Sequence, residues 1–380
     1  MHQDHQQYDI AVIGGGLAGL TLSIQCANAG YKTILFEKEQ YPFHKVCGEY
    51  ISLESLSFLE RLGINLKNFD VPVIKKLEVS DVKGSVYQFD LPLGGFGISR
   101  NTLDNQLYHL ALLKGVEVLT ATKVNDIIFN NNFFDIQTNK GNFTSIIAAG
   151  TFGKRSNIDV KFKRSFITQK TGKLNNYIGV KYHIRFPFAK ENIALHNFKN
   201  GYCGISNIED NKCCLCYLTT ANNLKANNNS IAEMEKNILW QNPVLKEIFS
   251  NATFLYKEPL VISQVSFNKK QQVENHVLMV GDAAGLIAPL CGNGMSMAMH
   301  AGKLAYENIN AFLEKKITRT QMEHHYTIQW QHQFSKRLFT GRTVQRFFGN
   351  NTSTSLFLAT MNKMPWLAKK IINTTHGQPF

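Results

Sequence analysis

The stretch from residue 9 to residue 37 restricts the fold of this chain more than any other part of its sequence. It begins with a short apolar run, continues with the residues GGGLAG, and then becomes an apolar segment with helical character. A buried strand, a G-x-G-x-x-G turn and a helix in this order are typical of a dinucleotide-binding βαβ unit. Residues 31–36 provide a second strand, and Glu37 stands at its end, 23 residues after Gly14. The sequence therefore predicts a parallel sheet with a dinucleotide at one edge.

Each glycine of this motif has a separate structural role. Gly14 permits the sharp turn out of the strand, Gly16 lets a pyrophosphate approach the backbone, and Gly19 lets the helix lie close to the sheet. Free N–H groups and the positive end of the helix dipole then face the phosphates. Glu37 can accept hydrogen bonds from a ribose, and Lys38 follows it directly. The candidate nucleotide contacts are Gly14, Gly15, Gly16, Leu17, Ala18, Gly19, Glu37 and Lys38.

The net charge is the unusual property of the composition. The chain has 380 residues, of which 44% are hydrophobic and 18% charged, as expected for a globular protein of about two to three domains. Its formal charge is +13, and such a charge attracts anionic substrates, phosphorylated cofactors, nucleic acid or acidic membranes. Because the basic residues are scattered without long runs, a basic solubilising surface is an equally good interpretation.

The seven cysteines give no sign of a disulfide framework. Their number is odd, and Cys213, Cys214 and Cys216 crowd one apparent strand, where thiols act as small hydrophobic groups. The N-terminal residues MHQDHQQ lack the apolar region of a signal peptide, and no stretch of 18 apolar residues is present. We therefore expect a cytoplasmic protein with reduced thiols, and we predict no metal site.

Segments of two kinds alternate along the chain. Alternating β patterns fill residues 71–99 and most of residues 157–270, where one helical stretch at residues 230–249 interrupts them. A helix opened by Arg100 and the strands that follow it return the chain to the first domain. We predict a nucleotide domain built from residues 1–70, 100–156 and 271–315, a substrate domain built from residues 71–99 and 157–270, and a helical C-terminal segment at residues 316–380.

A second motif, GDAAGLIAPLCGNG at residues 281–294, follows a short apolar strand. An aspartate at a strand end can accept hydrogen bonds from the ribityl hydroxyls of a flavin, and a bond to a charged group contributes about 1.5–3 kcal/mol. The proline and glycines let the backbone pass close to a flat ring, and the next helix points its N-terminus at the anionic edge of a reduced flavin. The candidate flavin contacts are Gly281, Asp282, Pro289, Gly292, Asn293 and Gly294.

The two motifs, with Arg100 between them, resemble the flavoprotein superfamily of para-hydroxybenzoate hydroxylase in order and spacing. The resemblance covers about residues 8–315. It implies an α/β fold, in which a FAD-binding Rossmann-like domain carries an inserted, mainly antiparallel β-sheet substrate domain and a helical C-terminal segment. It also implies that FAD is bound non-covalently, with its isoalloxazine ring facing a substrate cavity under the second sheet.

A narrower resemblance points to one branch of this superfamily. The P-x-x-K-x-C-G signature of geranylgeranyl reductases is similar to the stretch that contains Pro42, Lys45, Cys47 and Gly48. Their G-Y-x-W-x-F strand is similar to Gly201-Tyr202 with Ile205. By this resemblance the loop with Cys47 and Gly48 lies near the flavin ring.

The chain departs from its resembling families at two places. The hydroxylases carry G-A-D-G-x-x-S between their sheet blocks, with an aspartate that contacts flavin and nicotinamide nucleotide, whereas this chain has Phe152 there. Phe152 cannot accept those hydrogen bonds, so NADPH or NADH as the reductant is an open question. The halogenases carry W-x-W-x-I-P, and the three tryptophans of this chain form no such pair. Halogenation is therefore disfavoured.

Three residues are candidates for chemistry at the ring. Cys47 could donate a proton or shape the cavity, and the alternative is a small packing residue. Glu49 could act as an acid or base, and the alternative is a cap on the next helix. Arg100 could contact the cofactor, and the alternative is a surface ion pair.

These features favour a FAD-dependent monooxygenase that hydroxylates or epoxidises a hydrophobic small molecule, aromatic or polyketide-like. The alternatives are a FAD-dependent reductase of carbon–carbon double bonds and a non-catalytic flavin-binding redox sensor. The aromatic, basic C-terminal helices could cap the substrate domain, form a lid with a face for peripheral membrane contact, or bind a partner. No nucleic-acid-binding pattern is present, and the sequence leaves the oligomeric state open.

Overall fold

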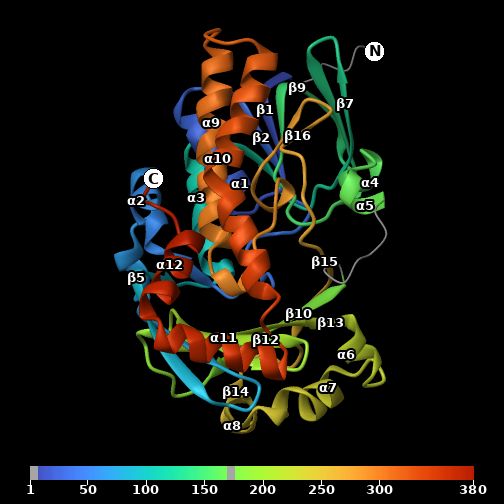
Figure 1. The fold of residues 1–380 in the computed structure, drawn as a ribbon. Helices are drawn as coiled ribbons and strands as arrows, with labels where there is room; N and C mark the ends of the chain where they lie inside the picture. Colours follow the sequence, from blue (N-terminus) through green and yellow to red (C-terminus); the bar gives the residue numbers. More distant parts are fainter. Residues whose placement is uncertain (1–6, 169–175) are drawn as a thin grey trace.

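The computed structural model describes residues 7–168 and 176–380, which form two β-sheets with helices packed around them (Figure 1). Sheet A, in the upper half of Figure 1, has the strand order β16-β17-β9-β1-β2-β6, with a β7–β8 hairpin attached to β9. Its strands are β1 (Gln7–Ile13), β2 (Thr33–Phe36), β6 (Glu117–Leu119), β7 (Val124–Asn130), β8 (Phe133–Thr138), β9 (Gly141–Gly150), β16 (Val273–Glu274) and β17 (Val277–Met279).

The register of sheet A brings three chain segments to one edge. Strand β1 pairs in parallel with β2 and with β9, so that Ile13 lies opposite Phe36 on one side and Gly150 on the other. The chain leaves all three strands at the same end. The glycine motif, Glu37 and the segment after residue 150 therefore meet at the carboxyl edge of the sheet, where α/β folds bind their ligands.

Helices cover sheet A because its strands are apolar on both faces. Helix α1 (Leu17–Asn28) lies between α3 (Arg100–Leu113) and α9 (Gly294–Leu313), and α10 (Arg319–Gln345) packs along α9 (Figure 1). The Ser99 side chain caps α3 by accepting a hydrogen bond from the N–H of Thr102. The remaining helical segments near sheet A are η1 (Leu53–Ser55), α2 (Leu56–Leu62), η2 (Leu66–Phe69), α4 (Asn157–Lys161), α5 (Ser165–Thr168), η4 (Gly281–Ala283) and η5 (Pro289–Cys291).

Sheet B is mainly antiparallel and has the strand order β14-β10-β13-β12-β11-β4-β5-β3, with β15 beside β10. Among the described residues of this sheet, β4 and β11 pair in parallel and the other strand pairs are antiparallel. The strands are β3 (Tyr50–Ser52), β4 (Val73–Ser80), β5 (Val86–Gly97), β10 (Tyr177–Arg185), β11 (Asn192–Phe198), β12 (Gly201–Ile208), β13 (Lys212–Thr220), β14 (Thr253–Phe254) and β15 (Leu260–Val265).

The helical stretch expected at residues 230–249 is interrupted. It consists of α7 (Ile231–Asn237), η3 (Leu239–Gln241) and α8 (Pro243–Asn251), and α6 (Ala221–Lys225) precedes it. Pro243 lacks a backbone N–H and so starts a helix more readily than it continues one. The Asn242 side chain caps α8 by accepting from the N–H of Val244 at 3.0 Å. These helices bury their apolar side chains against one face of sheet B.

Two segments lie elsewhere than the expected domain boundaries suggest. Strand β3 falls within the first expected segment of the nucleotide domain, yet it pairs with β5, placing Tyr50 opposite Gly97. Helix α4, expected in the substrate domain, packs on β7 of sheet A. Arg164, just after α4, is buried and donates to the carbonyl oxygen of Ala283 at 2.9 Å. Backbone pairing with β5 places β3, and the buried Arg164 holds the segment after α4. Neither interaction gives a periodic pattern that could be recognised in the sequence.

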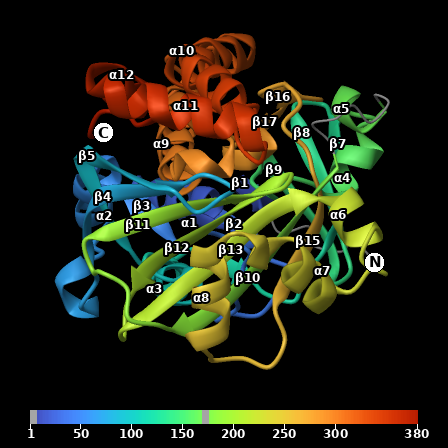
Figure 2. The ribbon, with the colours of Figure 1, turned by 60° about the horizontal axis from the view of Figure 1, so that its bottom comes forward.

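The C-terminal helices cover the other face of sheet B. Helices α11 (Asn351–Lys363) and α12 (Pro365–Thr375) follow α10, and α11 crosses the sheet in both views (Figures 1 and 2). Leu358 of α11 is buried in one apolar cluster with Val79 and Tyr202 of sheet B. This placement agrees with a capping role for the segment. Among the described residues, no helix is both long and apolar enough to cross a bilayer.

Candidate active site

The glycine turn joins β1 to α1 with very little space around it. Gly14 has a φ of +115°, and its N–H donates to the carbonyl oxygen of Phe36 at 2.8 Å. A Cβ added at Gly19 would lie only 2.0 Å from the carbonyl oxygen of Gly14. The first turn of α1 thus lies directly against the strand end, as expected for these glycines. Leu17 and Ala18 place the helix N-terminus at the wall of a cavity.

Glu37 lies at the end of β2 beside this turn. Its carboxylate accepts from the N–H of Gly15 at 2.8 Å and from the N–H of Glu39 at 3.0 Å, and its side chain is almost fully buried. The Tyr41 hydroxyl donates to the carbonyl oxygen of Gly15 and fills the space beside that glycine. Lys38, in contrast, is exposed and forms an ion pair with Glu39. Glu37 is thus held at the cavity edge, and Lys38, although mostly exposed, also lines the cavity.

Two cations face Gly16. A Cβ added there would lie 3.7 Å from Nη2 of Arg100 and 3.8 Å from Nζ of Lys45. Arg100 forms a two-pronged ion pair with Asp104 at 2.7 Å for both bonds, and Lys45 reaches the same carboxylate at 3.1 Å. Although burial by itself would raise the pKa of Asp104, the two cations lower it. The group keeps one net positive charge beside the glycine turn. Arg100 is therefore not part of a surface ion pair.

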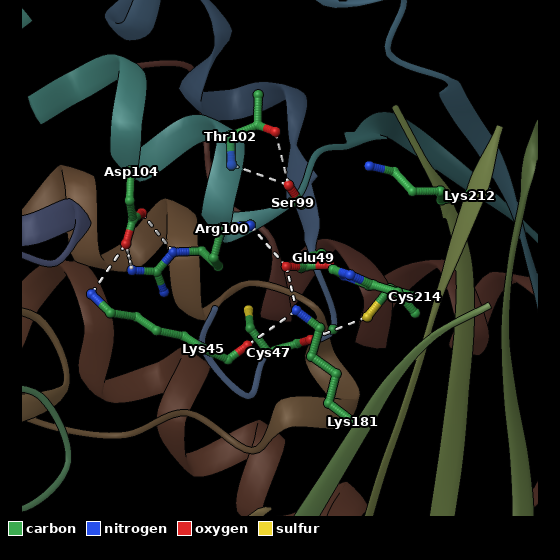
Figure 3. A network of polar contacts seen from close by, with 12 residues as sticks. Lys45, Cys47, Glu49, Ser99, Arg100, Thr102, Asp104, Lys181, Lys212 and Cys214 are labelled. Carbon is green, nitrogen blue, oxygen red and sulfur yellow. Dashed lines mark hydrogen bonds and ion pairs between the residues drawn. The ribbon is translucent and has the colours of Figure 1, made fainter. Parts of the chain in front are cut away.

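The Cys47–Glu49 loop is held by a buried polar cluster (Figure 3). The Glu49 carboxylate accepts from the backbone N–H of Arg100 at 2.8 Å, pairs with the Lys181 ammonium, and lies 2.6 Å from Nε2 of His183. Lys181 Nζ also donates to the carbonyl oxygen of Lys45 at 3.1 Å. Glu49 adopts a positive φ of 54° and has no exposed surface. This cluster fixes the loop between α3 and strand β10 of sheet B.

The surroundings of Glu49 make it a poor proton donor. Burial alone would raise the pKa of Glu49, but the hydrogen bond with His183 and the charge of Lys181 lower it to about 2. A general acid works best when its pKa lies near the working pH. The expected alternative, a cap on the next helix, is also wrong in its detail: Ser52 caps η1, and Glu49 accepts from the first N–H of α3. The geometry favours a positioning role for Glu49.

Glu49, His183 and Cys214 also place three potential metal-ligating atoms within 4.8 Å of one another. The Lys181 ammonium already neutralises the carboxylate. Cys214 Sγ is directed elsewhere, since it donates to the carbonyl oxygen of Cys47 at 3.2 Å. We therefore describe this cluster as an ion-pair network.

Asp282, in η4, has its carboxyl group at the cavity among three cations. Its burial raises the pKa of the carboxyl group, while Lys270, Lys154 and Arg100 act in the opposite direction. Lys270 donates to the backbone oxygen of Asp282 at 2.8 Å. Within the described part of the chain, no hydrogen bond to the Asp282 carboxylate oxygens is formed. The carboxylate is thus available to a ligand.

The other predicted flavin contacts of the second motif divide into residues that line the cavity and two, Gly281 and Asn293, that do not. Pro289, Gly292 and Gly294 line the cavity. Asn293 is fully buried and donates through its side chain to the carbonyl oxygen of Thr375 in α12 at 2.9 Å. Contact of Asn293 with a flavin stays a prediction, and its side-chain amide donor is already bonded to the C-terminal helix.

The cavity has a volume of about 1290 Å³ and connects the two sheets. One half is lined by the glycine turn, Glu37, Arg100 and Asp282. The other half is apolar and is lined by Val79, Leu195, Tyr202, Leu218, Leu358 and Met361 from sheet B and α11. Cys47, Gly48 and Cys216 are also in its wall. Ser206 donates to the carbonyl oxygen of Gly48 at 3.2 Å, which holds the loop against sheet B.

Phe152 lines the same cavity where the hydroxylases carry their aspartate. Its ring packs on Gly150 at the end of β9, and its backbone passes close to Gly14. It therefore offers an apolar surface beside the glycine turn.

The residues of the first cavity half fit FAD. The glycine turn is open to a pyrophosphate at Gly16 and is flanked by cations, and Glu37 is anchored beside it. Among the described residues, no side chain or backbone group forms a hydrogen bond with the Asp282 carboxylate, which lies at the cavity. In addition, residues 9–45 match the model of a family described as FAD binding domain. This match and the fold are consistent with a FAD-dependent oxidoreductase similar to those of the para-hydroxybenzoate hydroxylase-like superfamily. The resemblance seen in the sequence is thereby confirmed.

Comparisons with individual flavoproteins and other relatives place the chain among distant homologues. Conditioned medium factor receptor 1 of Dictyostelium discoideum is 23% identical over 90% of this chain and 72% of its own length. The digeranylgeranylglycerophospholipid reductase of Methanospirillum hungatei is also 23% identical, over 90% of this chain and 84% of its own. The structure of the flavin-dependent brominase Bmp2 superposes with a TM-score of 0.79 at 19% identity, covering 97% of this chain and 93% of that one. At this identity the structural likeness establishes the fold.

Several residues of this flavoprotein site were not identified from the sequence. Lys270 is buried and Lys154 half-buried near Asp282, and in both cases burial lowers the pKa of the ammonium group. Lys181 and His183 are two apart on β10, so both side chains project from the same face of the strand. Two polar residues at this spacing in an otherwise apolar strand were the available signal.

We expect Asp282→Asn to weaken FAD binding while leaving the protein folded. The substitution keeps the size of the side chain but replaces charged hydrogen bonds by neutral ones, which reduces their contribution by about 1 to 1.5 kcal/mol and raises the Kd for FAD about tenfold. The Kd can be measured by titrating the apoprotein with FAD and following flavin fluorescence. Asp210→Asn, at an exposed position, is the control. An unchanged Kd in Asp282→Asn would contradict the role assigned to this carboxylate.

Proposed function

We propose that this FAD-dependent oxidoreductase is a monooxygenase that hydroxylates or epoxidises a hydrophobic small molecule. The observation that carries the proposal is the cavity, whose FAD-binding half opens into an apolar half roofed by α11. An apolar pocket that excludes water protects a reactive oxygenating species and holds an apolar substrate. Bound FAD would supply the redox chemistry, and the protein would supply orientation and electrostatics.

The residues of the chain have separate roles in this proposal. The glycine turn with Arg100 and Lys45 binds the pyrophosphate, and Asp282 orients the ribityl chain. Glu49, Lys181 and His183 hold the Cys47–Gly48 loop at the junction of the two cavity halves. Cys47 can hold or donate a proton at Sγ, because its side chain is part of the cavity wall.

The placement of Cys47 also favours a second candidate, the reduction of a carbon–carbon double bond. Such a reduction needs a proton donor beside the substrate in addition to a reductant. The resemblance to geranylgeranyl reductases rests on the stretch that contains this cysteine, and one distant relative is named as a digeranylgeranylglycerophospholipid reductase. Phe152 makes NADPH or NADH an open question as the reductant in either candidate.

One experiment separates the two reactions. The FAD-loaded protein is first reduced anaerobically with NADPH, NADH or dithionite. One sample is then mixed with oxygen and another with an isoprenoid olefin. Each is tested with and without candidate aromatic substrates. A product that gains one oxygen atom from labelled O₂ supports the monooxygenase. A product that gains two hydrogen atoms without oxygen supports the reductase and overturns our first proposal. Bromide is included in one arm, since incorporation of bromine would contradict both.

A substitution at Cys47 tests the same distinction. We expect Cys47→Ser to leave FAD binding unchanged within about twofold. If Cys47 donates the proton to a reduced olefin, the rate of that reaction should fall by about 10² or more, the scale of general acid catalysis. An oxygenation that only needs the shape of the cavity should keep most of its rate. Single-turnover rates with the reduced protein measure this, with Cys216→Ser as the matched control in the same wall.

A further inference from the structure

The C-terminal end of the chain carries an unbalanced positive charge. Residues 324–380 contain seven Lys or Arg and no Asp or Glu. One of the seven, Arg337, is buried in an ion pair with Glu54 from the start of the chain. Most of the others are exposed. Helices α11 and α12, which roof the cavity, carry three of the seven, Lys363, Lys369 and Lys370, and no acidic residue.

Helix α11 has two unlike sides. Thr354, Leu358 and Met361 recur at helical spacing and are buried, and the last two line the cavity. Leu356 and Lys363 lie on the opposite side, where 68% of Leu356 is exposed. The same helix thus contacts the proposed substrate space on one side and presents an apolar residue to solvent on the other.

Helix α12 repeats this arrangement. Ala368 is buried, and Ile371, Ile372 and Thr375 line the cavity beside it. Trp366, Lys369 and Lys370 recur on the other side, and Trp366 is 60% exposed. Met364, at the corner between α11 and α12, is exposed as well. We call the set Leu356, Lys363, Met364, Trp366, Lys369 and Lys370 the α11–α12 outer face.

The α11–α12 outer face has no partner among residues 7–168 and 176–380. None of its three lysines forms an ion pair there. The two views agree that α11 and α12 lie on the outside of the molecule (Figures 1 and 2). Exposed apolar side chains rimmed by basic residues mark interaction sites, and because α11 and α12 carry lysines but no Asp or Glu, the charge of this face favours an anionic partner.

We propose that the α11–α12 outer face docks on an anionic lipid bilayer. Tryptophan and leucine insert at the headgroup boundary of such a surface, and lysines beside them gain from the negative potential of the lipid. The helices would lie in the plane of the interface with the cavity directly beneath them, so that an apolar substrate could pass from lipid to cavity past their edge. The proposal holds for either reaction proposed above, because it concerns location and not chemistry.

The test measures binding of the FAD-loaded protein to vesicles by co-sedimentation. We expect binding to vesicles of phosphatidylcholine mixed with phosphatidylglycerol, weaker binding at high salt, and little binding to phosphatidylcholine alone. Replacing Lys363, Lys369 and Lys370 by Gln should lower the partition coefficient about a hundredfold. Replacing Leu356 and Trp366 by Ser should lower it at least tenfold, on the scale of about 1.5 kcal/mol or more for a buried apolar side chain.

A control variant and a local probe complete the design. Leu113→Ser with Lys114→Gln removes an exposed leucine and a lysine at the end of α3, which is not part of the α11–α12 outer face, and should leave binding unchanged. Brominated acyl chains should quench tryptophan fluorescence in the wild type and not in Trp366→Phe, which should still bind.

Three outcomes would overturn the proposal. The first is the absence of binding to anionic vesicles by the folded, FAD-loaded protein. The second is binding that the α3 variant lowers as much as the α11–α12 variants do. The third is that the protein does not bind vesicles but forms dimers in a concentration-dependent way that Trp366→Ser abolishes. A second copy of the chain would then cover the α11–α12 outer face. Because no arm measures catalysis, failure here is distinguishable from failure of the proposed reaction.

Discussion

Replacement of Glu49 by glutamine is expected to lower the free energy of unfolding by about 3–5 kcal/mol, the cost of leaving buried charges without their counterion. Glu49 and Lys181 are both fully buried, and His183 lies 2.6 Å from the same carboxylate. Glutamine keeps the volume but removes the charge that the Lys181 ammonium needs. Denaturant unfolding of the FAD-loaded protein, followed by circular dichroism, measures the loss.

The loss should depend on pH in a defined direction. The pKa of Glu49 is lowered from 4.5 to about 2, so the folded state favours the carboxylate. Its contribution is present above pH 4.5 and disappears as the pH falls toward 2, and about 3 kcal/mol is at stake for a shift of this size. The gap in stability between wild type and Glu49→Gln should therefore be full at neutral pH and close in acid.

Two further variants test whether the loss of stability comes from the buried ion pair. Adding Lys181→Met to Glu49→Gln should restore part of the stability, because the unpaired ammonium is then gone. Glu191→Gln breaks an exposed ion pair with Lys76 and should leave the transition nearly unchanged. If Glu49→Gln behaved like Glu191→Gln, the cluster would not hold the loop.

Substitution of Gly19 by alanine should destabilise the protein by about 1–3 kcal/mol and weaken FAD binding by tenfold or more. The new Cβ would lie 2.0 Å from the carbonyl oxygen of Gly14, and a backbone atom cannot rotate away as a flexible side chain can. Helix α1 must then move off β1, which costs stability and displaces the helix N-terminus that would face the pyrophosphate.

Unfolding curves and FAD titration together test this effect. Gly204→Ala, in β12, is the matched control, since its new Cβ would meet nothing closer than 3.5 Å. The control should fold and bind FAD normally. Normal FAD affinity in Gly19→Ala would mean that the helix start is not the phosphate-binding element.

The parts of the site that could be predicted from the sequence are those whose residues lie close together along the chain. The glycine turn and Glu37 need only one strand, one helix and a second strand, and Asp282 follows its own strand directly, so local pattern fixes all three. The parallel register of β1 with β2 and β9 then brings them to one edge.

The parts that could not be predicted depend on pairing between distant segments. Lys181 and His183 reach Glu49 across 132 and 134 residues, and only the position of β10 in sheet B brings them there. Asn293 is the last residue but one of the second motif, yet its side chain donates to the carbonyl oxygen of Thr375. The spacing of residues within the second motif gives no information about a hydrogen-bond partner in α12, the last helix of the chain.

The short strand β3 has a consequence for how ligand binding could be detected from the absorption of the flavin. It follows Glu49 directly and is hydrogen-bonded to β5, so the loop at the flavin is continuous with the sheet over the substrate space. A shift of sheet B would therefore also displace the Cys47–Glu49 loop. The yellow colour of the bound flavin should then change when a molecule settles in the apolar half of the cavity, even one that never touches the ring, which makes the cofactor a built-in optical sensor for ligand screening.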